Sequence, residues 1–263
     1  MKKIPALVLA ALMLVPTVLH AQSMPTPAPS PYNDVQLSSS HDSVSNSFGE
    51  WWTTDLWFVR QDGNPGDNKH TVYVDVEDTS RFSKHDVQLL AGTYFPLAGS
   101  LSATVEGSVS TAQVLPSYNV FGELSYGSGQ GWFEKLGAYH REYPANSVNA
   151  GEFTLERYWG RFRASYTFTA AQLNGQGTDV MHSAGFDYYY GPYSSVAGVR
   201  YQTGTDIENV GVPALLVSSV DGWTLVGQHV FNPHWAFAYQ LERYVQGTTY
   251  TRTGGGLGLR YRF

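Results

Sequence analysis

The chain has 263 residues, a formal net charge of −6 and no cysteine. The lack of cysteine excludes a domain held by disulfides, thiol catalysis and zinc–thiolate sites, and the acidic balance gives no sign of nucleic-acid binding. There are 27 Gly and 18 Tyr. The mean hydropathy of −0.25 argues against a bundle of membrane helices, but not against a membrane barrel, whose strands face lipid only at every second residue.

The N-terminus has the features of a secretory signal peptide. Lys2 and Lys3 precede an apolar stretch at residues 4–19, and small residues follow it. We predict a signal peptide at residues 1–21 that is removed from the mature protein. A retained helical anchor is the alternative, but the apolar stretch is short for a bilayer span and contains two prolines.

A Pro-rich segment and a long uniform region follow. Proline occupies alternate positions from Pro25 to Pro31, which predicts an extended periplasmic tether at residues 22–33. Residues 34–263 show no helical periodicity and no internal boundary, so we predict one all-β domain. The candidate strands in chain order are residues 35–42, 49–60, 70–78, 85–95, 100–110, 118–126, 132–142, 151–159, 161–171, 180–190, 193–202, 222–231, 234–245 and 254–263.

The connections between these strands alternate between short and long. Short turns rich in Gly, Pro and Asn occur at residues 96–99, 127–131, 160, 191–192 and 232–233, and longer connections occur at 111–117, 143–150, 172–179, 203–221 and 246–253. This alternation is typical of outer-membrane barrels, which have tight periplasmic turns and longer outside loops. We therefore predict a single antiparallel up-and-down transmembrane β-barrel of about 14 strands. A count of 12 stays open, because strand 35–42 is weak and turn 61–68 is long for the periplasmic side.

The last ten residues indicate where the chain resides. Leu257, Leu259, Tyr261 and Phe263 alternate with Gly256, Gly258, Arg260 and Arg262, which gives a strand with one apolar face. Gly258, Tyr261 and Phe263 resemble the Gly-x-x-aromatic-x-Phe signal that delivers outer-membrane barrels to their assembly machinery. The expected partners are therefore outer-membrane lipid and the barrel assembly machinery, and the expected location is the outer membrane.

Residues 85–263 resemble the YaiO family of outer-membrane barrels. The resemblance rests on the order of the tight turns, the segments 187–192 (DYYYGP) and 198–201 (GVRY), and the ending at residues 260–263. It implies the outer membrane of a Gram-negative cell and carries no established chemistry. The tether and the long turn at 61–68 depart from the family's pattern.

Strand alternation places a set of charged residues on the interior face. The interior set is Glu106, Glu152, Glu156, Arg161, Arg163, Asp187, Arg200, Glu242, Arg260 and Arg262, with Asp75, Glu77 and Glu123 in equivalent positions. Acids and bases on neighbouring strands, such as Glu156 with Arg163 and Asp187 with Arg200, can meet across the sheet. This pattern fits a hydrated, salt-bridged lumen, and a charge-selective pore is the sharper alternative.

No residue pattern indicates catalysis or a cofactor. His182 and Ser183 are adjacent on one strand and point to opposite faces, so they cannot act as base and nucleophile, and no serine stands opposite His140. The segment 62–68 carries oxygen ligands for calcium, but a plain reverse turn is the preferred interpretation, with a calcium site as the alternative. We predict no catalytic residue, no metal site and no cofactor. The tryptophans lie mostly near strand ends, as in interfacial girdles, with a carbohydrate-binding platform as the alternative.

The function that these patterns favour is non-enzymatic. We expect a small pore, or an envelope component associated with transport or secretion of a surface saccharide, with surface polysaccharide or small solutes as further partners. Two alternatives remain open: a membrane-embedded lipid hydrolase or acyl-modifying enzyme, and a structural or assembly barrel without transport.

Overall fold

The computed structural model describes residues 31–46, 48–63, 70–209 and 215–263. The predicted signal peptide and most of the predicted tether lie outside these residues. The described residues form fourteen strands: β1 (Tyr32–Val44), β2 (Gly49–Asp62), β3 (His70–Arg81), β4 (Lys84–Ala98), β5 (Leu101–Ser110), β6 (Tyr118–Gly129), β7 (Trp132–Glu142), β8 (Ser147–Trp159), β9 (Phe162–Leu173), β10 (Gln176–Tyr190), β11 (Ser195–Glu208), β12 (Leu216–Val230), β13 (Trp235–Gln246) and β14 (Tyr250–Arg262). Across the described ranges, no helix has the length and apolarity to cross a membrane.

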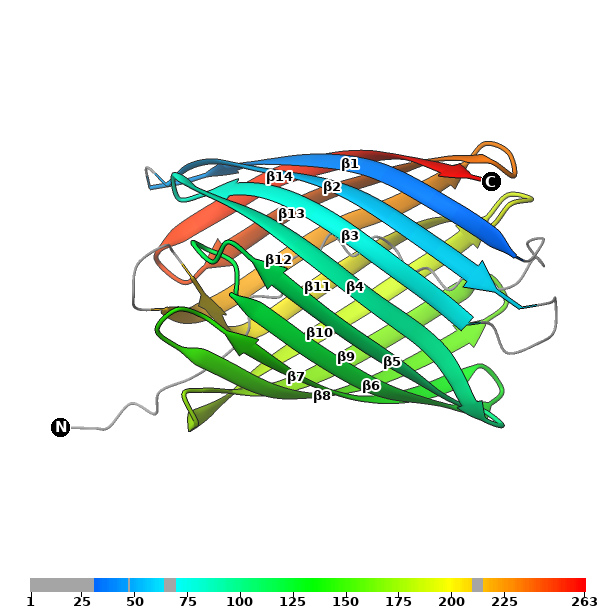
Figure 1. Ribbon diagram of the computed structural model, residues 1–263, viewed down its shortest axis with the longest axis horizontal. Helices are drawn as coiled ribbons and strands as arrows, with labels where there is room; N and C mark the ends of the chain where they lie inside the picture. The colour runs from blue at the N-terminus through cyan, green and yellow to red at the C-terminus, as the bar shows by residue number, and fades with distance from the viewer. Residues whose placement is uncertain (1–30, 47, 64–69, 210–214) are drawn as a thin grey trace.

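The strands form one closed antiparallel barrel in which each strand pairs with its neighbours in the sequence (Figure 1). The barrel closes between β1 and β14, in a register that runs from Asp34 opposite Arg262 to Val44 opposite Arg252. The backbone amides of Asn33 and Phe263 each donate to the other's carbonyl at 2.9 Å. Closure removes the unpaired edges that an open sheet would expose. The prediction of fourteen strands is confirmed, and the weak first strand is a full member of the barrel.

Side chains alternate between the two faces of the wall, as the sequence predicts. On β3, Val72 and Val76 are exposed on the outer face, whereas Asp75 and Glu77 are buried inside. The outer face carries large exposed hydrophobic residues such as Leu136, Leu241 and Leu257. A band of exposed apolar side chains is stable where the surroundings are lipid, and the inverted pattern of polar interior and apolar exterior is that of a membrane barrel.

The main difference from the sequence prediction lies in the loops. The connections predicted at residues 172–179 and 203–221 shorten to 174–175 and 209–215, because β10, β11 and β12 continue past the apolar part of each strand. The long and short connections therefore differ less in length than the sequence predicts. We call the end with Tyr32 and Phe263 the N/C end, and the opposite end, with the connections 111–117 and 209–215, the loop end. Residues 64–69 are not described, so the calcium alternative for the turn at 62–68 lies largely outside the described residues.

Candidate functional site

The interior of the barrel holds the predicted charged residues, with one correction. Inward-facing positions are occupied by Glu106 on β5, Glu152 and Glu156 on β8, Arg163 on β9, Asp187 on β10, Arg200 on β11, Glu242 on β13, and Arg260 and Arg262 on β14. Arg161 lies instead in the turn before β9 and is exposed, because β9 begins one residue later than its alternation suggested. Among the assembly-signal residues, Tyr261 and Phe263 face outward and Gly258 faces inward.

Lys135 and four of these charged groups form a continuous ladder toward the N/C end. Lys135 Nζ lies 3.2 Å from Glu156, which is 4.0 Å from Arg163. Asp187 then bridges two arginines, at 2.7 Å from Arg163 Nε and 2.6 Å from Arg200 Nη2. The ladder crosses β7 to β11 through neighbouring strands, so each buried charge has an opposite partner. This arrangement holds charges in the wall at a smaller desolvation cost than isolated charges would carry.

Gly198 is the local sequence feature that makes room for the ladder. It lies opposite Asp187 in the register, and a Cβ at this position would overlap the Asp187 carboxylate. Any larger residue would push the carboxylate away from Arg200.

A second charge group joins the closing strands at the N/C end. Arg262 donates two hydrogen bonds to the Asp34 carboxylate, at 2.7 and 2.8 Å. Arg260 lies 3.9 Å from the same carboxylate, and the Arg262 guanidinium lies 3.9 Å from the centre of the Tyr32 ring. A bidentate arginine–carboxylate pair is geometrically specific, so this pair fixes the register at which the barrel closes. Asp34 was not among the predicted interior residues, because strand 35–42 was expected to start after it.

Toward the loop end, Arg252 is surrounded by acids and aromatic rings. Its Nε lies 3.0 Å from Glu242 and 3.9 Å from Asp42. Its guanidinium lies 5.2 Å from the Trp51 ring centre and 4.8 Å from that of Tyr244. Desolvated cation–π contacts of this kind stabilise a buried arginine.

Apolar and aromatic side chains fill the interior at the loop end. One buried cluster brings together residues from β7 to β13, including Tyr139, Met181 and Tyr244. A second cluster joins Trp51 and Tyr250 with Phe82. Trp51 and, farther along β2, Trp57 face inward and are almost fully buried, so these two tryptophans are not part of the expected interfacial girdle. These two clusters occupy interior space at the loop end.

Hydrogen bonds to Asp86 hold the connection between β5 and β6, residues 111–117, at the loop end. The Asp86 carboxylate accepts hydrogen bonds from the backbone amides of Gln113, Val114 and Leu115, the last two at 2.6 and 2.8 Å. Asn209, which precedes the β11–β12 connection, donates its side-chain amide to the Gln113 carbonyl at 3.4 Å. A contact between elements 96 residues apart shows that the loop reaches toward the far wall.

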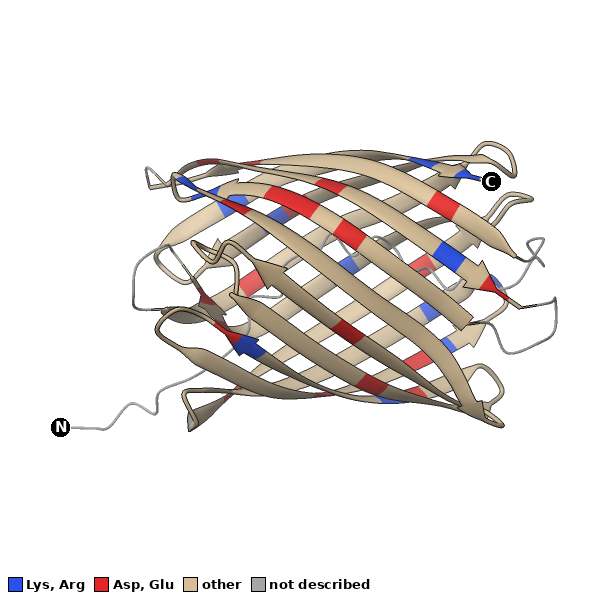
Figure 2. Ribbon diagram, viewed as in Figure 1, with Lys and Arg blue, Asp and Glu red and all other residues tan. Residues whose placement is uncertain are grey.

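Negative charge is concentrated on one side of the lumen. The inward-facing acids on β2 to β6 are Asp55, Asp75, Glu77, Asp86, Glu106 and Glu123. In the described parts of these strands and their connections, the basic residues are Arg60, Arg81 and Lys84. Figure 2 shows the acidic residues along the front strands of the wall. On β7 to β11 the ladder is mixed, because Lys135, Arg163 and Arg200 are paired with Glu156 and Asp187. The β2–β6 side of the lumen therefore carries the larger uncompensated negative charge.

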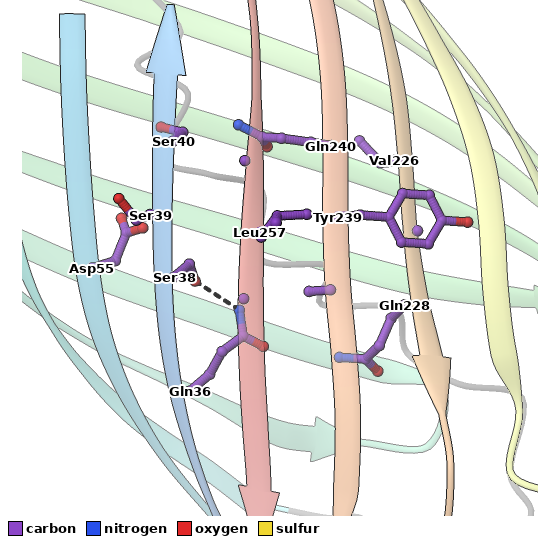
Figure 3. Close-up of a pocket in the computed structure, with 14 residues that line it drawn as sticks. Gln36, Ser38, Ser39, Ser40, Asp55, Val226, Gln228, Tyr239, Gln240 and Leu257 are labelled. Carbon is purple, nitrogen blue, oxygen red and sulfur yellow. Dashed lines mark hydrogen bonds between the residues drawn. The ribbon is translucent and has the colours of Figure 1, made fainter.

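A small hollow with a cavity volume of about 40 Å³ lies in the wall formed by β12, β13, β14, β1 and β2 (Figure 3). Gly256 and Gly258 leave space on β14, because a larger side chain would meet Ser40 and Ser38 on β1. Polar groups border this space: Gln36, Ser38, Ser40, Asp55, Gln228 and Gln240. The sequence showed the glycines and their alternation, but not that three primary amides line the space beside them.

The histidines considered for catalysis face outward. His182 Nδ1 lies 2.7 Å from the Tyr166 hydroxyl, and His140 contacts Asn149 Oδ1 at 2.8 Å and the Tyr118 hydroxyl at 3.2 Å. Both are parts of aromatic clusters on the outer surface. Within the described residues, no hydrogen bond joins a serine hydroxyl to a histidine.

A protein-family model matches most of this barrel. The family model named YaiO membrane beta barrel domain matches residues 32–209. The chain belongs to the YaiO family. The YaiO resemblance predicted from residues 85–263 is confirmed with a different extent. The match begins at the first strand and includes the turn at residues 61–68, which departed from the family's pattern in the sequence.

Solved structures show the same fold. The YaiO chain is similar to Omp33 of Acinetobacter baumannii, with 9% identity and a TM-score of 0.52 over 89% of this chain and 99% of that one. It is also similar to OmpF of Salmonella typhi, with 7% identity and a TM-score of 0.51 over 89% and 97%, and to OprD of Pseudomonas aeruginosa, with 10% identity and a TM-score of 0.50 over 89% and 95%. No protein with a curated description matches significantly. The chain is thus an outer-membrane β-barrel of porin-like fold.

Proposed function

We propose that this YaiO barrel is a non-enzymatic conduit that binds and passes small hydroxyl-rich solutes, in particular short saccharides. The hollow bordered by Gln36, Gln228 and Gln240 carries the proposal. A primary amide offers two donors and an acceptor, which match the neighbouring hydroxyls of a sugar. Gln36 and Gln228 are buried side chains on the inner wall, so they are held in place rather than free in solvent.

The surroundings of the hollow support passage of a neutral polar solute. Ser38 and Ser40 add hydroxyls, and Gly256 and Gly258 have no side chain that would fill the space beside them. Asp55 lies at its edge (Figure 3). Pockets that recognise small molecules combine a shaped concavity with a few placed polar groups.

The filled loop end favours a second candidate, a structural or assembly barrel that conducts nothing. Its support is the packing of Trp51, Phe82 and Tyr250 and the loop fastened to Asp86. Under the conduit proposal, this end opens by movement of residues 111–117.

The test is block of ion current by a neutral trisaccharide, maltotriose, in planar bilayers that contain the purified barrel. Wild-type protein should conduct small ions and show block that saturates with maltotriose concentration. Gln228→Leu should weaken the block about fivefold, the effect of losing roughly 1 kcal/mol of hydrogen bonding. Gln172→Leu changes an exposed glutamine on the outer face and should leave the block unchanged. Equal block in both variants would refute the hollow as the binding site, and absence of any current would favour the structural barrel.

A further inference from the structure

Three carboxylates meet inside the wall on β2 and β3. One oxygen of each of Asp55, Asp75 and Glu77 lies within 4.8 Å of an oxygen of the other two. Asp55 stands directly opposite Glu77 in the antiparallel register, and Asp75 shares the inward face of β3 two residues earlier. The three side chains expose 2%, 1% and 0% of their surface. The cluster is therefore part of the wall and not a patch of solvated surface acids.

Four of the six carboxylate oxygens of this cluster lack a hydrogen-bond partner. Asp55 Oδ1, Asp75 Oδ1 and both carboxylate oxygens of Glu77 are buried without a hydrogen bond. Arg81 approaches only to 3.9 Å from Glu77. A buried charge is stable when an opposite charge and hydrogen bonds compensate for lost water, and one distant guanidinium does not do this for three carboxylates.

Other basic groups do not supply the missing charge. In the described parts of β2 to β6, Arg60 is paired with Asp62, 2.9 Å away, and Lys84 is an exposed residue at the start of β4. The arginines of the ladder on β9 and β11 are bound to Asp187. A bound cation, or protons on the carboxylates themselves, can therefore balance the charge of these oxygens.

We propose that Asp55, Asp75 and Glu77 form a calcium-binding site in the barrel wall. A donor set of carboxylate oxygens alone suits hard cations. Calcium forms bonds of about 2.4 Å, so one ion can bridge oxygens that lie up to twice that distance apart. Magnesium, with bonds of about 2.1 Å and a strict octahedral geometry, tolerates less variation in the positions of its ligands than calcium does. The site is separate from the turn at residues 62–68.

The ion has access to the site from the lumen. Asp55 also borders the hollow beside Ser38 and Ser39 (Figure 3), so one ligand is reached without opening the sheet. Coordination positions that the three carboxylates leave free can take water. This proposal depends on the geometry of β2 and β3 and holds whether or not the barrel conducts saccharides.

Terbium luminescence tests the site on the complete barrel folded in detergent. Terbium(III) binds oxygen sites of the calcium type and emits when a nearby indole is excited. Trp57 stands opposite Asp75 in the register, which places a buried indole beside the cluster. Wild-type barrel should give sensitised emission that calcium displaces. Asp75→Asn and Glu77→Gln should each weaken terbium binding about tenfold or more, since even changes beyond the direct ligands of a metal reduce affinity that much.

Asp78→Asn is the matched control, because Asp78 neighbours Glu77 on β3 but is exposed on the outer face. It should retain wild-type emission. Thermal unfolding gives a second readout: in chelator, Asp75→Asn should unfold at the same temperature as wild type or higher, since repulsion is relieved, and calcium should stabilise only wild type. Absence of wild-type emission, equal loss in Asp78→Asn and Asp75→Asn, or displacement by magnesium at lower concentration than calcium would each overturn the calcium site.

Discussion

Asp187 is the residue on which the interior ladder depends. It contacts Arg163 at 2.7 Å and Arg200 at 2.6 Å while its own side chain is 1% exposed. Removing its charge leaves two guanidinium groups that face each other without a shared anion. Removing one partner of a buried ion pair lowers the stability of the fold strongly, because the other charge stays buried without compensation. Replacing both partners by apolar residues has a much smaller effect.

Asp187→Asn should therefore destabilise the folded barrel by about 3 kcal/mol. The measurement is the temperature at which the compact, heat-modifiable band converts to the unfolded band in a detergent gel, combined with unfolding in urea. Asp78→Asn, which removes only an exposed contact to His85, should cost about 0–1 kcal/mol. Equal costs for the two variants would show that the ladder contributes no specific stability.

Ser165 and Tyr166 test the assignment of faces one residue apart. Tyr166 is 43% exposed on the outer face, whereas Ser165 faces inward, opposite Glu156 in the register. An arginine in the lipid near the midplane costs roughly 2–4 kcal/mol. Tyr166→Arg should lower the yield of folded barrel in lipid vesicles, and Ser165→Arg should fold normally because an acid lies opposite. Indistinguishable folding yields would contradict the facing.

Part of the interior could be read from the sequence and part could not. Glu156, Arg163, Asp187 and Arg200 follow directly from alternation in strands with a clear apolar face. Asp55 escaped notice because its strand carries aromatic residues on both faces, Trp51 and Trp57 inside and Trp52 and Phe58 outside. An alternation with a period of two does not show which face of a strand points inward when both faces carry apolar residues.

At the scale of elements, the loop at residues 111–117 is held by a single acidic side chain. Asp86 accepts from three consecutive backbone amides and from the Thr111 hydroxyl, which compensates donors that would otherwise be unsatisfied in the buried mouth. The loop buries Val114 and Leu115 against Phe82. Nothing in the sequence linked Asp86 to a segment about 28 residues away, because this contact depends on the loop folding inward.

Asp86→Ala should release this loop. Four donors lose their acceptor, so the inward conformation should become less favourable by about 1–3 kcal/mol. Thermolysin, which cuts before aliphatic residues, should then cleave at Val114 or Leu115 in the folded barrel, and ion conductance should rise. The control is Asp62→Ala, which removes a carboxylate at the N/C end. A loop as resistant to thermolysin as that of wild type would show that Asp86 does not hold it.

At the scale of the whole molecule, strand number and order followed from the sequence and loop lengths did not. The alternation of apolar and polar residues ends where a strand leaves the bilayer, because both faces of the strand then contact water and can carry polar residues. The segments at residues 172–179 and 203–221 read as loops for this reason, although β10, β11 and β12 pair through much of them. Pairing of backbone groups continues wherever a neighbouring strand is present, whatever the side chains.

The orientation in the membrane remains a prediction: the N/C end in the periplasm and the loop end outside. An epitope inserted after Ala145, which is exposed in the β7–β8 connection, should be reached by antibody on intact cells. One inserted after Asn232, in the β12–β13 turn, should be reached only after the outer membrane is opened. The reverse labelling would invert the orientation.

Swelling of liposomes that contain the purified barrel tests the conduit most directly. Vesicles filled with an impermeant polymer are diluted into isotonic solutions of neutral sugars of increasing size, and light scattering reports sugar entry. We expect swelling that is fastest for a pentose, slower for a disaccharide, and faster in Asp86→Ala than in wild type. Swelling no faster than that of protein-free liposomes, in both proteins and with every sugar, would contradict a conducting lumen.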